Sequence, residues 1–204
     1  ADVDPACLQR VLTTAVDASL NMVTIDGDNS TNDTVLVLAS GEAGNPTIMG
    51  GEAEVALQEA VSQVCTTLAK EIARDGEGAS RLIIVEVAGA RDQDDARKAA
   101  RTVASSNLVK AAVNGADPNW GRVMMALGRS GAAADETKID LFVNGVCIME
   151  AGSPIPFHRD AVVSQMRSPE VTFRLQLNLG DGEAIAWGCD LTEEYVIINS
   201  AYTT

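Results

Sequence analysis

Helical spacing of apolar side chains predicts three helices in the first half of the chain. The first opens at Asp4-Pro5, where Asp4 can cap the free amides, and carries Leu8, Val11, Leu12, Ala15 and Val16. A longer helix over residues 51–74 has one apolar face, made of Leu57, Val61, Val64, Leu68 and Ile72. A third helix starts at about Asp92 and uses Ala96, Ala99, Ala100 and Val103.

Two continuous apolar runs lack this spacing. Residues 82–87 follow a helix stop, Asp75-Gly76-Glu77-Gly78, and read as a buried strand. Residues 35–39, Val-Leu-Val-Leu-Ala, fit a buried helix or a buried strand equally well, and periodicity does not separate the two.

Alternation of apolar and polar residues dominates the last third of the chain and predicts strands. Residues 139–143 lead into Asn144-Gly145, a two-residue hairpin turn, and then into residues 146–148. A short helix is expected over residues 160–166. The remaining predicted strands cover residues 171–179, 185–189 and 195–198, the last of which should finish the sheet. Helices mixed with antiparallel hairpins, without a regular βαβ rhythm, indicate the α+β class.

Length and charge narrow the class of protein. The 204 residues, 46% of them hydrophobic, suffice for one large domain or two small ones, with a sub-boundary expected near residues 130–138. A net charge of −14 disfavours nucleic-acid binding and suits cationic small molecules, although solubility alone accounts for it. The chain shows no run of roughly 18 apolar residues and no signal-peptide pattern at its start, so no membrane partner is expected.

Neither the cysteines nor the polar loop after residue 25 has the pattern of a metal site. Cys7, Cys65, Cys147 and Cys189 form no CxxC pair and have no histidine nearby, which predicts reduced thiols in a cytoplasm-like compartment. The segment 26–32 begins like a calcium loop but lacks its glycine and its final glutamate, which favours a hydrogen-bonded turn that caps the next helix. We therefore expect no metal and no bound cofactor.

Three other features are candidates for chemistry. Glu77 stands between two glycines, either as a solvated residue at a helix stop or as a carboxylate held at a cleft to pair with an ammonium group. In Asp117-Pro118-Asn119-Trp120-Gly121-Arg122, the structural interpretation is that Asn119 caps a helix, Trp120 anchors the loop and Arg122 pairs with a carboxylate. His158, the only histidine, is expected at the surface.

Four blocks in this order resemble the β chain of the ornithine acetyltransferase family, over nearly all of the chain. They are residues 26–34 (DGDNSTNDT), 75–79 (DGEGA), 117–122 (DPNWGR) and 199–202 (NSAY). The resemblance implies a layered sandwich of mostly antiparallel sheets flanked by helices, and completed by a separate α chain. On this interpretation, residues 1–204 are the β chain, within an α2β2 heterotetramer.

The resemblance also implies an activity in arginine biosynthesis. A precursor cleaves itself before a threonine, which becomes the nucleophile and carries acetyl from N-acetylornithine to glutamate. That threonine is expected upstream of Ala1, so no catalytic residue is assigned within the sequence. The implied location is the cytoplasm, or the mitochondrial matrix in a eukaryote, and the sequence leaves open whether acetyl-CoA is also a substrate.

Three residues match substrate-binding positions of the family: Glu77, Asn199 and Thr204. Segment 26–33 and the loop 119–122 are expected to shape the site rather than to contact substrate. Two other classes stay open. A related self-cleaving aminopeptidase-type hydrolase would use water as the acceptor, and a catalytically silent binding chain would lack the threonine.

Overall fold

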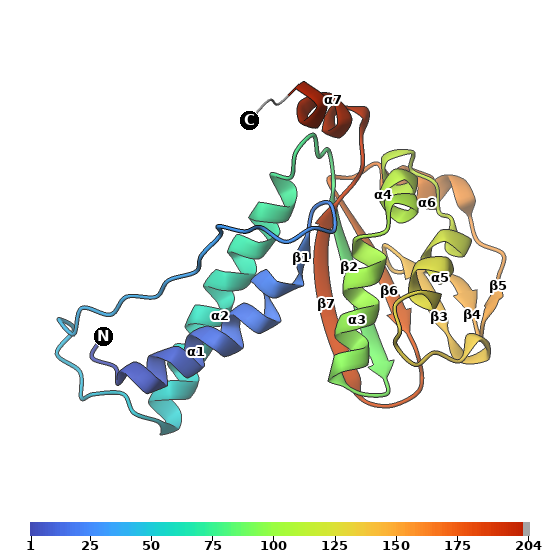
Figure 1. Cartoon of the computed structure of the whole chain (residues 1–204). Helices are drawn as coiled ribbons and strands as arrows, with labels where there is room; N and C mark the ends of the chain where they lie inside the picture. Colours follow the sequence, from blue (N-terminus) through green and yellow to red (C-terminus); the bar gives the residue numbers. More distant parts are fainter. Residues whose placement is uncertain (202–204) are drawn as a thin grey trace. The chain divides into compact units, whose positions relative to one another are not determined.

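The computed structural model describes residues 1–201, which form helices and one seven-stranded sheet (Figure 1). The contacts divide the chain into two compact units. Unit 1 comprises residues 1–21 and 29–69, and unit 2 comprises residues 22–28 and 70–204. The division therefore separates an N-terminal helical part from the sheet and does not fall near residues 130–138.

Unit 1 is built on two helices, α1 (Pro5–Ala18) and the greater part of α2 (Gly51–Arg74). Asp4 caps α1 as predicted, because its carboxylate accepts hydrogen bonds from the amides of Ala6 and Cys7. The helices are joined by Gln58, which donates to the carbonyl of Val11, and by an ion pair of Arg10 with Glu54 at 3.0 Å.

Unit 2 carries the mixed sheet, whose strands lie in the order β1-β7-β2-β6-β3-β4-β5. The strands are β1 (Val23–Thr24), β2 (Leu82–Ala90), β3 (Asp140–Val143), β4 (Val146–Glu150), β5 (Ser153–Pro154), β6 (Glu170–Gln176) and β7 (Gly182–Cys189). Antiparallel pairs predominate, and only β1–β7 and β2–β6 are parallel. The predicted α+β class is confirmed. Residues 1–201 contain a single sheet, so a second sheet of the sandwich that the family resemblance implies is not found among them.

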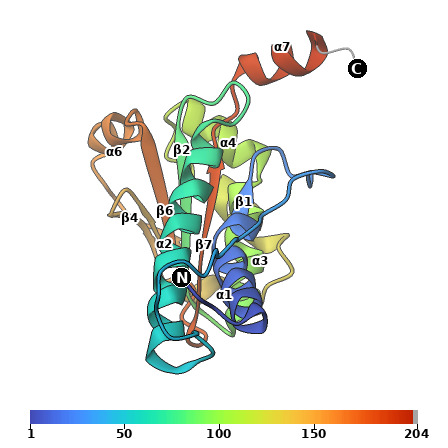
Figure 2. The same cartoon turned by 90° about the vertical axis from the view of Figure 1, so that its left-hand side faces the viewer.

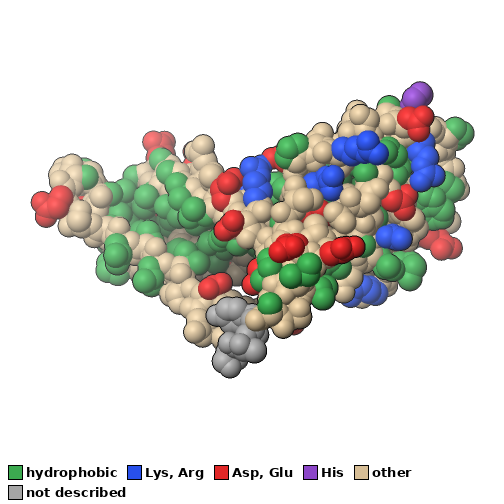
Figure 3. All heavy atoms as spheres, turned by 90° about the horizontal axis from the view of Figure 1, so that it is seen from above, with side chains coloured by type: hydrophobic (Ala, Val, Ile, Leu, Met, Phe, Trp, Pro, Cys, Tyr) green, Lys and Arg blue, Asp and Glu red, His purple; other side chains and the backbone are tan. Residues whose placement is uncertain are grey.

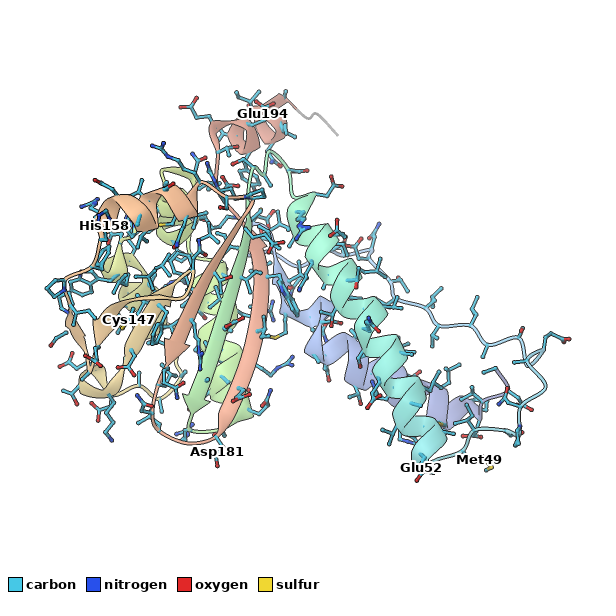
Figure 4. All side chains as sticks on the ribbon, turned by 180° about the vertical axis from the view of Figure 1, so that it is seen from behind. Met49, Glu52, Cys147, His158, Asp181 and Glu194 are labelled. Atoms are coloured by element: carbon cyan, nitrogen blue, oxygen red, sulfur yellow. The ribbon has the colours of Figure 1, made fainter. Side chains whose placement is uncertain are left out.

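Helices cover one face of this sheet. They are α3 (Gln93–Ala104), α4 (Asn107–Asn114) and α5 (Trp120–Gly128), while α6 (Arg159–Met166) precedes β6. Helix α3 contacts β2 and β7 and buries the alanine face predicted for it (Figure 1). Beneath the helices, Val85, Phe173 and Ala186 are almost completely buried. Ile185 and Arg174 alternate with Ala186 and Phe173 along their strands and so belong to the second face, where Ile185 remains 43% exposed and Arg174 is exposed. Figure 4 looks onto this face.

Two predictions of buried apolar segments were wrong. Residues 35–39 form neither helix nor strand, and the side chains of Leu36 and Leu38 are 77% and 92% exposed. Residues 195–198 lie in helix α7 (Glu193–Ala201), beyond the end of β7 (Figure 2), and do not form a strand. A run of four apolar residues carries no period, and Glu193 and Glu194 place negative charge in the first turn, where the helix dipole favours it.

Helix α2 forms over the predicted residues but does not bury the predicted face. Its buried positions are the small residues Cys65, Ala69 and Ala73. The large apolar side chains lie one position earlier, at Val64, Leu68 and Ile72, and are about half exposed. We call these three residues the α2 stripe. Among the helices of residues 1–201, none combines the length and apolar character that crossing a bilayer requires.

Candidate substrate site at the end of unit 2

The turn after α2 holds Glu77 between two glycines that no other residue could replace without a clash. A side chain on Gly76 would place its Cβ 2.8 Å from the sulfur of Cys189, at the end of β7. On Gly78, whose φ is +68°, it would lie 2.6 Å from the backbone nitrogen of Tyr195. The hydroxyl of Thr192 also donates to the carbonyl of Gly78 at 2.6 Å. The turn is thus wedged between the end of the sheet and the start of α7.

A buried lysine fixes the segment next to this turn. Lys110 on α4 is 1% exposed, and its ammonium group donates to the carbonyl of Ile25, in the segment that follows β1. The same nitrogen lies 3.9 Å from the sulfur of Cys189. Burial raises the pKa of the Cys189 thiol, although the neighbouring Lys110 opposes that shift. Lys110 therefore anchors the backbone immediately before Asp26.

Helix α7 then brings side chains over the turn. The amide of Asn199 donates to a carboxylate oxygen of Glu77 at 2.6 Å, and it also donates to the carbonyl of Tyr195 at 2.9 Å. One turn earlier on the helix, the Tyr195 hydroxyl donates to the carboxylate of Asp26 at 3.2 Å. Residues that are 122 and 169 positions apart in the sequence are joined in this way.

Negative charge gathers around Tyr195. Burial raises the pKa of its phenol, and the charge of Asp26, the hydrogen bond to Asp26, and the charges of Glu77 and Asp28 add to the shift. The three carboxylates belong to exposed residues. Carboxylates and amide oxygens gathered beside helix α7 suit a ligand that carries an ammonium group.

The structure brings two of the three predicted substrate-binding residues together. Glu77 and Asn199 share a hydrogen bond, and Asp26, assigned to shaping the site, contacts Tyr195. Thr204 lies outside the described residues. The sequence pattern does not indicate Tyr195, because it predicts a strand where the structure has helix α7. A helical interpretation would have placed Tyr195 and Asn199 on one face, four residues apart.

The 117–122 loop and His158 make contacts of their own with α4, α5 and α6. Asn119 caps α5, as predicted, but Arg122 donates to the carbonyl of Leu108 at 3.0 Å and forms no ion pair with a carboxylate among residues 1–201. It is Arg159 that pairs with Asp117, at 3.3 Å. His158 is at the surface as predicted, where its ring accepts from the amide of Ala161 at the start of α6 (Figures 3 and 4).

The segment after β1 folds as the predicted hydrogen-bonded turns. The carboxylate of Asp26 accepts from the amide of Asp28, and the Ser30 hydroxyl accepts from the amide of Asp33. No helix follows directly, so the expected capping role is wrong. Within residues 1–201, no group of three or more histidine, cysteine or acidic side chains is arranged to hold a metal ion. The four cysteines are free thiols.

Comparison with known proteins identifies close relatives over the whole chain. The model of the ArgJ family matches residues 1–204. The arginine biosynthesis bifunctional protein ArgJ of Symbiobacterium thermophilum is 55% identical, and that of Dehalococcoides mccartyi is 49% identical. Each alignment covers 100% of this chain and 51% of the relative, so the chain spans about half the length of these proteins.

A solved structure has the same fold. The crystal structure of the arginine biosynthesis bifunctional protein ArgJ from Bacillus halodurans superimposes with a TM-score of 0.96 at 39% identity. The alignment covers 99% of this chain and 96% of the crystallised chain. At 39% identity, the two chains are alike in sequence as well as in fold.

The electrostatics of Tyr195 give a testable prediction. In a Tyr202→Phe variant, Tyr195 is the only remaining tyrosine, and its phenol should titrate above the ordinary value of about 10. Asp26→Asn should bring the pKa back toward that value, and Asp181→Asn, in the turn before β7, should not. Ultraviolet absorbance of the phenolate measures this directly.

The sign of the effect on stability follows from the same shift. A raised pKa means that folding favours the neutral phenol, so the contribution to stability is present below the unfolded pKa and is lost as the pH rises through the folded value. An ordinary titration of Tyr195, unchanged by Asp26→Asn, would contradict the hydrogen bond.

Proposed function

Because this chain belongs to the ArgJ family, we propose that it is the half of an acetyltransferase of arginine biosynthesis that binds the ammonium end of the substrate. The observation that carries the proposal is the hydrogen bond between Glu77 and Asn199, beside Asp26 and Tyr195. Family resemblance selects Glu77 and Asn199 from the sequence alone. The two side chains meet where the turn after α2 lies against α7, which supports a common role in contacting N-acetylornithine.

The proposed reaction has two steps. A threonine hydroxyl upstream of Ala1 attacks the acetyl carbonyl of N-acetylornithine, the bond from that carbon to nitrogen breaks, and ornithine leaves after its amine gains a proton. The amine of glutamate then attacks the acetyl-threonine, forms N-acetylglutamate and returns the hydroxyl. The threonine's own amine suits the role of base, and donors from the α chain would stabilise the oxyanion.

In this scheme, Glu77 recognises the side-chain ammonium group of N-acetylornithine. Its carboxylate is exposed and already accepts one hydrogen bond, from Asn199, which orients it without neutralising it. The charges of Asp26 and Asp28 add to the attraction of a cation. The names of the relatives place those proteins in arginine biosynthesis, in which the proposed acetyl transfer would act.

We further propose that a separate α chain, the other half of the same precursor, covers the exposed apolar side chains. The α2 stripe leaves Val64, Leu68 and Ile72 about half in solvent, and α7 exposes Val196 and Ile197 by more than half. Hydrophobic side chains also gather at the surface of unit 1 (Figure 3). The Bacillus halodurans crystal contains a chain of similar length to this one, which supports a protein made of two chains.

The assembly and its surroundings follow from the same proposal. Precursor cleavage in front of the threonine would give the two chains, and two copies of each would form an α2β2 heterotetramer. The enzyme would work in the cytoplasm, or in the mitochondrial matrix of a eukaryote, without a bound cofactor. Use of acetyl-CoA as a second acetyl donor would make this protein bifunctional, as the names of its relatives describe them.

Replacing Glu77 tests the substrate contact. In the full-length protein, Glu77→Gln keeps the shape but removes the charge, so kcat/KM for N-acetylornithine should fall by roughly tenfold or more, the effect of losing a charge-assisted contact worth about 1.5–3 kcal/mol. Glu150→Gln, an exposed carboxylate on β4, is the matched control.

A second substrate separates ammonium recognition from general damage. N-acetylnorvaline has the same acetylated amine but no side-chain ammonium group, so its low kcat/KM should be the same in wild type and Glu77→Gln. Equal losses with both substrates would reject Glu77 as the ammonium contact. Release of acetate without transfer to glutamate would instead favour the hydrolase.

The α2 stripe yields a prediction about assembly. Leu68→Ser removes a large apolar side chain that is 51% exposed, so folding should change little while the affinity for the α chain falls about tenfold. Co-purification through a tag on the α chain measures the association. Glu59→Ser, an exposed polar position on the same helix, is the control. Unchanged association in Leu68→Ser would show that the α chain does not cover the stripe.

A further inference from the structure

An apolar segment of unit 1, residues 35–39, has the properties of a strand but no neighbouring strand. Residues 33–40 contain no helix, turn or bend (Figure 1). The backbone of residues 35–39 forms no hydrogen bond to any other part of residues 1–201. Its sequence, Val-Leu-Val-Leu-Ala, is rich in residues that favour strands. We call residues 35–39 the unpaired segment.

The side chains of the unpaired segment are left in solvent. Leu36 and Leu38 are 77% and 92% exposed, and alternation along an extended backbone places them on one face. On the other face, Val37 is half-buried. Five apolar residues with no charge, glycine or proline favour aggregation when the backbone is also unpaired. We therefore expect the native protein to provide a partner for this segment.

A hollow of about 420 Å³ lies beside the unpaired segment, within unit 1. The N-terminal residues, α1, α2 and the unpaired segment all contribute to it. Ser40 is the only polar residue of its lining, which consists of Ala1, Val3, Leu8, Val37, Leu38, Ala39, Ser40 and Leu57. A lining of this kind suits apolar side chains rather than a charged ligand.

The first residues of the chain already run alongside the stretch that follows the unpaired segment. The carbonyl of Ala1 accepts from the amide of Gly41 at 3.1 Å, and Val3 forms a parallel bridge with Ile48. Since both contacts advance in the same direction, a chain continued upstream from Ala1 would run beside residues 35–40 and parallel to them. Parallel neighbours need a long connection that usually contains a helix, and here the connection contains α1.

We propose that the stretch of the full-length protein directly upstream of Ala1 forms a strand parallel to the unpaired segment and fills the hollow with its apolar side chains. The inference rests on the proposed function, in which the polypeptide continues upstream of Ala1 and carries the reactive threonine there. The alignments cover only 51% of the relatives, so these proteins contain the additional sequence that such a strand needs.

The pairing would have a direct consequence for the reaction. A strand that is hydrogen-bonded to the unpaired segment holds the threonine in one position, whereas a loop would leave it free to move. The unpaired segment is then a positioning element, because it acts on substrate only through the strand that it supports. An edge strand of the α chain and a second copy of this chain are the competing partners.

Hydrogen exchange in the full-length protein tests whether the unpaired segment is paired. Its amides should exchange at least about tenfold more slowly than those of residues 42–44, in the turn that follows. Exchange as fast as in that turn would overturn the proposal. Protection that appears only at high protein concentration would identify a second copy as the partner and would also overturn it.

A cysteine scan in the full-length protein identifies the neighbouring strand. Leu38→Cys, at an exposed position where the substitution should not disturb folding, is combined with a cysteine at each of the six positions upstream of Ala1 in turn. Adjacent strands lie about 4.8 Å apart, within the range that a disulfide spans, so a disulfide should form only at alternate positions. Peptide mass mapping detects it. Glu59→Cys, at an exposed position on α2, is the control and should form none.

Neither measurement depends on acetyl transfer. Protected amides without a disulfide at any of the six positions would assign the segment to the α chain, and would overturn this inference while leaving the proposed function intact. The expected disulfides in a protein that transfers no acetyl group would instead contradict the proposed function alone.

Discussion

The candidate site depends on the close approach that two glycines allow. Because Gly76 and Gly78 have no side chains, the turn after α2 reaches the sulfur of Cys189 on one side and the backbone of Tyr195 on the other. That approach sets the distance between Glu77 and helix α7, and so permits the 2.6 Å hydrogen bond from Asn199. Lys110 stabilises the arrangement, because its ammonium group donates to the carbonyl of Ile25, the residue before Asp26. Any Cβ at Gly78 would separate the turn from the helix that completes the site.

Much of unit 2 could be predicted because its sequence patterns are local. The alternation around Asn144-Gly145 produced the hairpin of β3 and β4, and the alanine face of α3 lies against the sheet as expected. The strand predicted over residues 195–198 was wrong, and residues 35–39 stayed open between helix and strand. A short apolar run has no period until its partners are known. The pairing of Glu77 with Asn199 was equally beyond local patterns, and only family resemblance indicated both residues.

The apolar surface of α2 follows from which of its side chains are buried. The sequence shows a stripe of large side chains, and the usual inference is that the largest ones are buried. In the structure, the buried positions are occupied instead by Cys65, Ala69 and Ala73, which leaves Val64, Leu68 and Ile72 in solvent. The chain spans about half the length of its relatives. The exposed α2 stripe therefore supports the proposal that the other half supplies a partner chain that covers it.

The central claim is that Glu77 and Asn199 act on substrate as one unit. A double-mutant cycle of Glu77→Gln and Asn199→Ala, measured as kcat/KM for N-acetylornithine in the full-length protein, tests it most directly. If Asn199 acts by orienting the Glu77 carboxylate, the double variant should be hardly worse than the poorer single variant, with a coupling energy of about 1 kcal/mol or more. Strictly additive losses, or no loss in either single variant, would contradict the claim.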